Sequence, residues 1–236
     1  MGTGPGSAGA SSMNPDSDAG TGTLQGNVLL LTDDSFVRAS LFTSGATVTA
    51  DGASGSPVSA DWDGADPFVL DGVAQVATNW VHVKPTLVGG DPLPTYQAVR
   101  TNEVTKADLA LVSSTMLDVI FTEVSSLRSP DSGQVVLFFR SAGTGTPLAG
   151  LHVTMAKAQA AVYETSAGWV LDDGTAVTGP DGLIVFGNVE PANSNGTQSV
   201  IVTRAATATA PAAAAGQFAV KVVRGAVTLA TVDVQL

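Results

Sequence analysis

The chain carries the same four sequence marks twice, in the same order. GNVLLL begins at Gly26 and GQVVLF begins at Gly133, and SGATVTA in the first half is followed by AGLHVTM in the second. DGADPFVLDGV and WVHVKP in the first half then correspond to DGLIVFGNV and SVIVTR in the second. Such a repeat indicates two copies of one folding unit. In a chain of 236 residues, each copy has the size of a β-sandwich domain, about 100 residues.

Within each copy, short apolar or alternating stretches are separated by Gly, Pro, Asp and Ser, which is typical of antiparallel strands. Hydrophobic residues make up 44% of the chain and charged residues only 13%, which favours buried strands over solvated helices. We expect the last two strands to form a hairpin around Arg224 and Gly225. The predicted strands are 24–31, 47–50, 68–70, 80–84, 135–139, 153–156, 183–186, 200–203, 218–223 and 227–234.

One segment departs from the strand pattern. Residues 101–128 contain no Gly or Pro, and their apolar side chains recur every three to five positions, as on one face of a helix. Thr101 or Asn102 can cap the amino end. We predict one amphipathic helix that packs against a sandwich or between the two; the alternative is a partner-binding helix. The apolar residues are Val104, Leu109, Val112, Met116, Val119, Ile120, Val124 and Leu127.

The predicted fold class is therefore mainly β, with two tandem antiparallel β-sandwich modules and one amphipathic helix between them. Residues 1–23 have almost nothing to bury and predict a disordered tether. The N-terminal sandwich, the degenerate copy, spans 24–100, the connecting helix 101–128 and the C-terminal sandwich 132–236. The tether resembles the spacer of a bacterial lipoprotein, which implies a lipid-anchored N-terminus, although the lipidated cysteine is absent. An inert tail is the alternative.

Charge and composition argue against several classes of function. The chain has 21 acidic and 10 basic side chains, and this net charge of -11 repels phosphate backbones, so nucleic acid is not an expected partner. The acidic excess either attracts divalent cations or only keeps the surface soluble. The absence of cysteine excludes disulfides, thiol catalysis and zinc–thiolate sites. No transmembrane span or signal peptide is visible.

The second copy carries a pattern close to P-L-A-G-x-x-V-T followed by T-x-x-D-G-x-x-x-F-x-N-V-x-P. It resembles carboxypeptidase regulatory-like domains, whose fold is transthyretin-like or carbohydrate-binding-like, and the resemblance extends to exported bacterial surface proteins. The first copy departs from the pattern, because it has DWDGADPF in place of the second element and lacks the P-L-A-G lead. The resemblance implies a scaffold without catalytic residues and an extracellular or cell-surface setting. The matching residues are Pro147, Leu148, Ala149, Gly150, Val153, Thr154, Thr178, Gly179, Pro180, Asp181, Gly182, Phe186, Asn188, Val189 and Pro191.

Three aromatic residues are the candidates for ligand binding. Trp62 lies in an acidic turn, and Tyr163 and Trp169 lie in the insertion of the second copy, all in predicted loops. Glycan recognition needs aromatic platforms beside polar side chains. The alternative is that these rings cap the ends of the sandwiches.

The candidate metal ligands are Asp61, Asp63 and Asp66 in ADWDGADPF. Their spacing around a glycine lets alternate carboxylates converge on a hard cation, so Ca²⁺ is the candidate cofactor. The segment is not an EF-hand, because the later bidentate glutamate is missing. The alternative is that these aspartates are turn residues that bond nearby backbone amides.

The two histidines, His82 and His152, offer little for catalysis. In each predicted strand the flanking residues are apolar, so both imidazoles are expected on the outer face. No G-x-S-x-G turn is present. The sequence therefore predicts a non-catalytic secreted or cell-surface structural or adhesion protein, with a glycan or a surface protein as partner. The alternative is a carbohydrate- or calcium-binding module, and a hydrolase ranks last.

Overall fold

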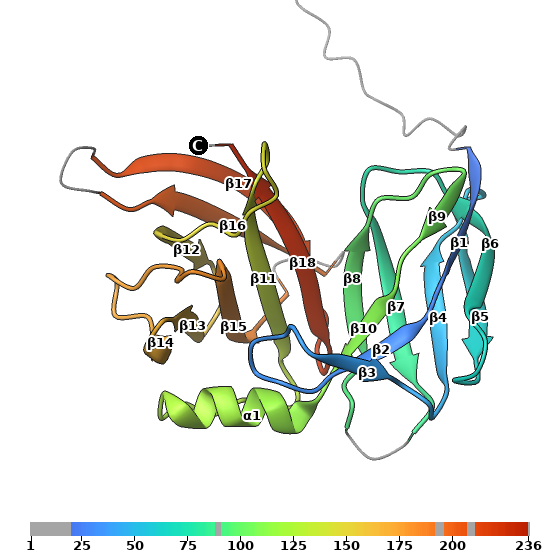
Figure 1. Ribbon diagram of the computed structural model, residues 1–236, viewed down its shortest axis with the longest axis horizontal. Helices are drawn as coiled ribbons and strands as arrows, with labels where there is room; N and C mark the ends of the chain where they lie inside the picture. Colours follow the sequence, from blue (N-terminus) through green and yellow to red (C-terminus); the bar gives the residue numbers. More distant parts are fainter. Residues whose placement is uncertain (1–19, 88–90, 192–195, 207–210, 236) are drawn as a thin grey trace, which may run out of the picture.

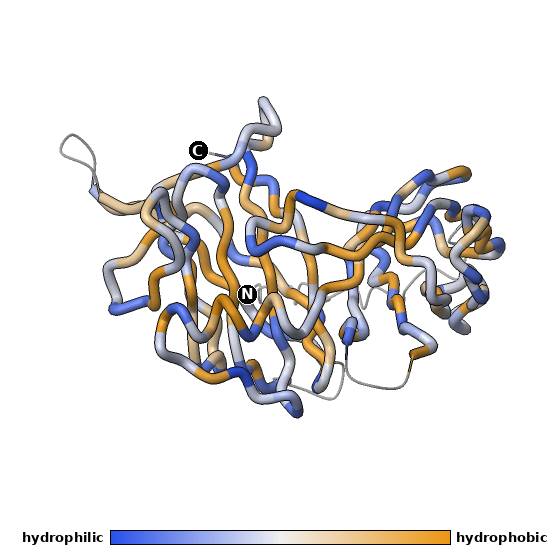
Figure 2. Tube along the Cα trace, turned by 60° about the horizontal axis from the view of Figure 1, so that its bottom comes forward, coloured by the Kyte–Doolittle hydropathy of each residue, from blue (hydrophilic) through white to orange (hydrophobic). Residues whose placement is uncertain are grey.

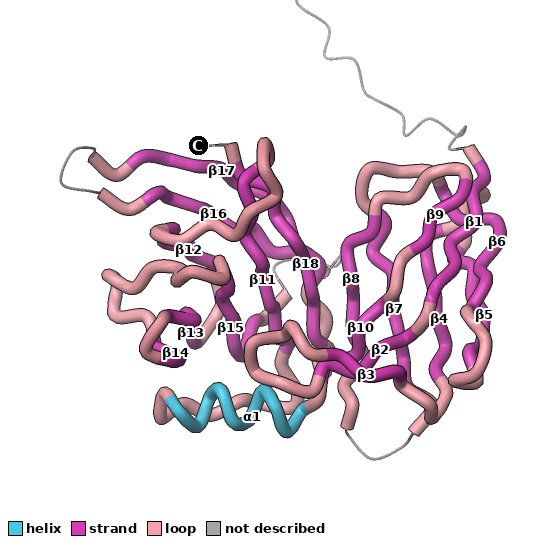
Figure 3. Tube along the Cα trace, in the orientation of Figure 1, coloured by secondary structure: helices cyan, strands magenta, loops and turns pink. Residues whose placement is uncertain are grey.

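The computed structural model describes residues 20–87, 91–191, 196–206 and 211–235. Strands dominate this part of the chain (Figures 1 and 3), which confirms the predicted mainly-β fold class with antiparallel sheets. None of the helices described is long and apolar enough to cross a membrane. The elements are β1 (Thr21–Gly26), β2 (Val28–Leu31), β3 (Ala39–Leu41), β4 (Ala46–Asp51), β5 (Pro57–Trp62), β6 (Phe68–Ala74), β7 (Asn79–Pro85), β8 (Thr95–Val99), β9 (Val104–Lys106), β10 (Leu109–Val112), α1 (Ser114–Glu123), β11 (Gly133–Ser141), β12 (Leu151–Met155), β13 (Ala160–Thr165), β14 (Gly168–Leu171), β15 (Leu183–Val189), β16 (Thr197–Arg204), β17 (Ala213–Lys221) and β18 (Val227–Val234).

The N-terminal half is a sandwich of two layers. Strands β8, β7, β4 and β5 form one layer, and the two short sheets β6-β1-β9 and β10-β2-β3 form the other. Figure 2 shows hydrophobic segments, in orange, interspersed with hydrophilic ones in both halves of the molecule. The layers enclose a core that includes Leu24, Val28, Val48, Trp62, Phe68, Leu70, Val81, Leu109 and Leu111.

The C-terminal half is a second sandwich. Strands β14-β13-β15-β11-β18 pack against the sheet β12-β16-β17. The core between them includes Val135, Leu137, Phe139, Leu151, Val153, Tyr163, Ile184, Phe186, Val200 and Val220.

The repeat seen in the sequence has a topological counterpart. The β1–β2 segment pairs antiparallel with β6 and parallel with β9 and β10, and β11 likewise pairs antiparallel with β15 and parallel with β18. The succession β4-β7-β8 corresponds to β12-β16-β17, since both are antiparallel throughout. The strands that carry the four repeated marks therefore occupy equivalent positions in the two halves.

The two halves share one sheet. Strand β18 pairs in parallel with β11 of its own half and with β8 of the other, where Thr95 lies opposite Val227 and Gln97 lies opposite Leu229. Nine strands therefore run without interruption in the order β14-β13-β15-β11-β18-β8-β7-β4-β5. This junction removes one exposed strand edge from each sandwich, and exposed edges are prone to unwanted pairing.

Helix α1 covers the outer face of the C-terminal part of this sheet and lies below it in Figure 1. Its buried side chains are Met116, Leu117, Ile120 and Phe121. They share a third core with Val136, Val162, Val185, Leu229 and Phe36. The C-terminal half thus has three layers, and β15 is buried at every position because both of its faces are covered.

The predicted helix over 101–128 is wrong in its first part. Helix α1 begins only at Ser114 and ends at Glu123, and two strands, β9 and β10, occupy the residues before it. Leu109 and Leu111 are buried in the N-terminal core while Ala110 is only partly buried, which is the period of two of a strand. Pairing with β1 and β2 completes the first sandwich and outweighs the helical spacing.

Two further boundaries differ from the prediction. Most of the predicted tether lies outside the described residues, but residues 21–23 belong to β1, because backbone pairing with β6 holds them although they bury little apolar surface. The predicted terminal hairpin does not form. Strand β17 pairs with β16, and β18 crosses to the other layer.

Candidate functional site

The two copies differ at one sheet edge. In the first copy, β5 pairs with β4 and extends that layer. In the second copy the corresponding strand, β13, pairs with β15 in the opposite layer. Strand β12, the counterpart of β4, therefore has β16 as its single strand partner among the described residues.

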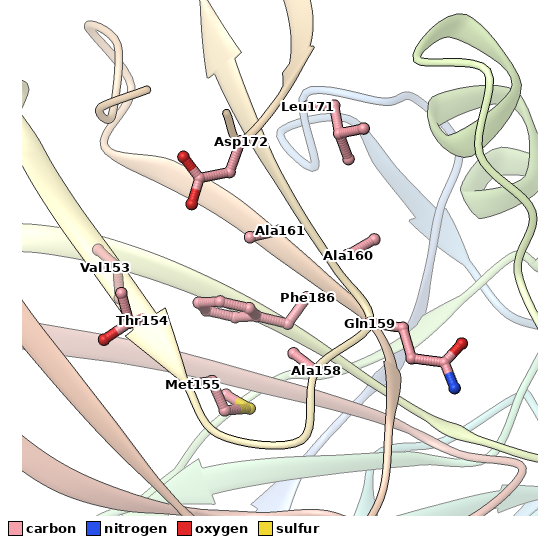
Figure 4. A pocket seen from close by; sticks show the side chains of 10 residues that line it. All are labelled: Val153, Thr154, Met155, Ala158, Gln159, Ala160, Ala161, Leu171, Asp172 and Phe186. Carbon is pink, nitrogen blue, oxygen red and sulfur yellow. The ribbon is translucent and has the colours of Figure 1, made fainter. Parts of the chain in front are cut away.

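A pocket of about 280 Å³ opens beside this edge, between the two layers of the C-terminal sandwich (Figure 4). The ring of Phe186 lies near its centre in that view, with Met155 on one side and Ala161 on the other. Small side chains at three positions of the wall leave the space open. The pocket is lined by Val153, Thr154, Met155, Ala158, Gln159, Ala160, Ala161, Leu171, Asp172 and Phe186.

Asp172 is the one carboxylate among the lining residues. Its side chain is 19% exposed, and its Oδ2 lies 3.6 Å from Nε2 of His152. That distance is too long for a hydrogen bond, and the buried Nε2 has no hydrogen-bond partner in the described part of the chain. Oδ1 accepts a hydrogen bond from the backbone of Gly174 at 2.9 Å. The pocket thus combines apolar and polar side chains with one partly buried carboxylate.

Tyr163 is fully buried in the C-terminal core and lies in β13 rather than in a loop. Its hydroxyl accepts a hydrogen bond from the backbone N–H of Val153 and donates one to the carbonyl of the same residue, each at 2.8 Å. Burial, with a contribution from Asp172, raises the pKa of this hydroxyl well above its ordinary value. Tyr163 is therefore a structural residue and offers no open face to a glycan.

The other two candidate aromatics also have structural partners. Trp62 ends β5, is 3% exposed, stacks on Phe42, and donates its indole N–H to the carbonyl of Asp66 at 2.8 Å. Trp169 lies in β14 and packs against the third core. Since Trp62 belongs to the first sandwich and Trp169 to the second, the structure does not gather them into a common platform.

The three candidate calcium ligands are not brought together. Asp61 accepts a hydrogen bond from the Thr47 hydroxyl at 2.8 Å, and Asp63 accepts one from the backbone of Ala65 at 3.0 Å. Among the residues that the structure describes, no three acidic, histidine or cysteine side chains are grouped so as to hold a metal ion. Asp61 thus serves as a strand residue and Asp63 as a turn residue.

Both histidines lie against tyrosines. His82 stacks on Tyr96 with the ring centroids 4.4 Å apart, and burial together with the charge of Lys84 lowers its pKa. His152 stacks on Tyr163 at 6.4 Å. Sequence reasoning placed both imidazoles on open surfaces and did not anticipate that His152 lies beside Asp172, which lines a pocket. The alanines at 158, 160 and 161 were the available signal, because such small residues leave room inside a sandwich.

No protein-family model matches the chain, and no curated protein matches it. Solved structures do match: the TIE protein of Bacillus anthracis at 13% identity and a TM-score of 0.26, over 91% of this chain and 34% of that one. A shaft pilin of Lactobacillus rhamnosus GG matches at 11% identity and a TM-score of 0.25, over 89% of this chain and 98% of that one. The group B streptococcus pilus 2b backbone protein matches at 14% identity and a TM-score of 0.26, over 89% and 81%. The chain thus spans about a third of the TIE protein.

Proposed function

We propose that this chain is a non-catalytic structural unit of a secreted or cell-surface protein, in which two sandwiches act as one stiff spacer. The observation that carries the proposal is the parallel pairing of β18 with both β11 and β8. A flexible two-domain linker would leave few contacts across the boundary. Here a ladder of backbone hydrogen bonds crosses it.

Side-chain packing supports the same conclusion. Phe36, in the loop between β2 and β3 of the first half, is 6% exposed and packs edge-on against Phe138 of the second half, with ring centroids 6.1 Å apart. The Asp33 carboxylate stabilises this loop by accepting hydrogen bonds from the backbone N–H groups of Val37 and Arg38. Sheet, helix and loop therefore all resist a pivot between the halves.

The residues of the C-terminal motif support a scaffold role. The Thr178 hydroxyl donates to the carbonyl of Leu148 and accepts from the N–H of Leu151, which ties the P-L-A-G segment to the turn before β15. Asn188, with a left-handed backbone (φ 54°), accepts from the N–H of Ser129 and donates to the carbonyl of Leu127. Both side chains are occupied in holding loops and are not presented to a substrate.

A pulling experiment on the chain, held at its two ends, tests the spacer proposal. We expect one rupture event that releases both sandwiches, because extracting β18 breaks its pairing with both halves. Two separate events, each releasing about half of the chain, would contradict the proposal. The location is tested by labelling intact cells with antibodies against the folded protein, where labelling only after lysis would exclude a surface role.

A further inference from the structure

The pocket beside β12 is a feature of the second copy. In the first copy β5 lies along β4, the counterpart of β12. The change of partner by β13 opens the space in the second copy. The overall framework does not require this change, because the first sandwich is built without it.

The walls of the pocket suit an unbranched aliphatic chain. Met155, Leu171 and Phe186 provide apolar surface, and the alanines at 158, 160 and 161 keep the pocket free of bulky side chains. The volume of about 280 Å³ lies just below the range of about 300–1,000 Å³ that is usual for drug-sized ligands. A single long side chain is therefore a suitable occupant.

Asp172 adds a requirement for positive charge. Its Oδ2 has the His152 ring nitrogen at 3.6 Å, beyond hydrogen-bond distance, so it retains capacity to accept a charge-assisted hydrogen bond. The carboxylate is mostly screened from water, which strengthens its attraction for a cation. The net charge of -11 adds a long-range attraction for cationic partners and disfavours phosphates.

The rim of the pocket favours a protein as the source of this group. Leu171 of β14, which lines the pocket, is 41% exposed. A free amine would leave this apolar rim in water, whereas a protein surface that presents a lysine would cover it. We infer that the pocket binds the side chain of a lysine on a partner protein, with the stem on Phe186 and the ammonium group on Asp172.

The test is a titration of the full chain, followed by two-dimensional NMR, with Nα-acetyl-lysine methylamide as the probe. We expect shifts of the amides that line the pocket, and at least tenfold weaker binding of the norleucine analogue, which has the stem without the charge. Equal binding of the two probes, or shifts confined to other regions, would overturn the inference. Binding of n-butylamine without binding of the lysine amide would identify a free amine as the ligand and overturn the docking of a protein side chain.

Two substitutions make the test specific. Asp172→Asn should weaken binding of the lysine amide about tenfold, while Asp173→Asn, at an exposed neighbour whose carboxylate bonds Thr175 instead, should leave it unchanged. Ala161→Leu should abolish binding by filling the pocket with no change of charge. If Asp172→Asn and Asp173→Asn had the same affinity, the assigned role of Asp172 would be wrong. Melting temperatures confirm that each variant is folded before it is compared.

Discussion

The hydroxyl group of Tyr163 bonds both backbone groups of Val153, accepting from its N–H and donating to its carbonyl at 2.8 Å each. A side chain thus takes the place of a neighbouring strand at the edge of β12. Thr178 satisfies Leu151 in a similar way. Its hydroxyl accepts a hydrogen bond from the N–H of Leu151, and its backbone N–H donates one to the carbonyl of Leu151. These contacts explain how β12 keeps its outer edge unpaired with another strand, since its backbone groups are satisfied from within the sandwich.

Removal of the Tyr163 hydroxyl should lower the stability of the folded chain. Tyr163→Phe keeps the ring but leaves a buried N–H and a buried C=O of Val153 without their partner, so the free energy of unfolding should fall by about 2–4 kcal/mol. Urea denaturation measures this change. Tyr96→Phe is the matched control, because it keeps the ring that stacks on His82, and it should change stability by less than about 0.5 kcal/mol. Equal effects of the two substitutions would contradict the role given to Tyr163.

The same hydroxyl predicts a loss of stability at alkaline pH. Burial raises the pKa of folded Tyr163 above the ordinary value of 10.0, so above about pH 10 the unfolded chain loses this proton while the folded chain keeps it. The free energy of unfolding should therefore decline by about 1.4 kcal/mol for each pH unit above that point. Urea denaturation between about pH 9 and about pH 11, a range that brackets the ordinary tyrosine pKa, measures this slope. A Tyr163→Phe variant with the same slope as the parent chain would show that other groups cause it.

Gly187 of β15 allows helix α1 to approach the sheet. A Cβ atom at this position would lie 2.4 Å from the ring of Phe121, which is fully buried and cannot move aside. We expect Gly187→Ala to destabilise the protein by about 1–3 kcal/mol through overpacking. Gly216→Ala is the control, because a Cβ there meets no atom within 4 Å. Thermal melting of the two variants compares them, and a larger loss in Gly216→Ala would refute this packing account.

Calcium should leave the stability unchanged. Asp61 and Asp63 are engaged in separate hydrogen bonds, and the described residues contain no group of three side chains that could hold a metal ion. The melting temperature should be the same with millimolar calcium and with a chelator, because a ligand that bound the folded state would raise it. A calcium-dependent rise that Asp63→Ala removes would restore the acidic turn as a metal site.

The strands could be predicted where alternation or a continuous apolar run was strong. Leu183–Val189 is apolar at most positions because both faces are covered, and the two sets of repeated marks coincide with equivalent strands. The segment before α1 was misread because Leu109, Val112 and Met116 have spacings that suit a helix as well as a strand followed by a helix. Only its pairing with β2 distinguishes the two structures.

The junction between the halves could not be predicted from local pattern. Nothing in Thr95–Val99 indicates that β8 will pair with β18, which follows more than about 120 residues later, since the local pattern of a strand does not determine which distant strand it will pair with. The burial of two candidate aromatics could not be predicted from local pattern either. Trp62 and Tyr163 resemble exposed loop residues in the sequence, but both rings are buried. The Trp62 indole bonds the backbone of Asp66 in the adjacent turn, and the Tyr163 hydroxyl bonds the backbone of Val153 in the core.

Native-state hydrogen exchange in a Leu70→Ala variant tests most directly whether the two halves form one unit. Leu70 is 2% exposed in the N-terminal core, and its truncation should lower the free energy of unfolding by about 2–5 kcal/mol. If the shared sheet makes the chain one cooperative unit, the slowest amides of β11 and β15 should lose the same free energy of protection as those of β7. Unchanged hydrogen-exchange protection in β11 and β15 would show that the second sandwich is stable by itself and would contradict the proposal of one stiff spacer.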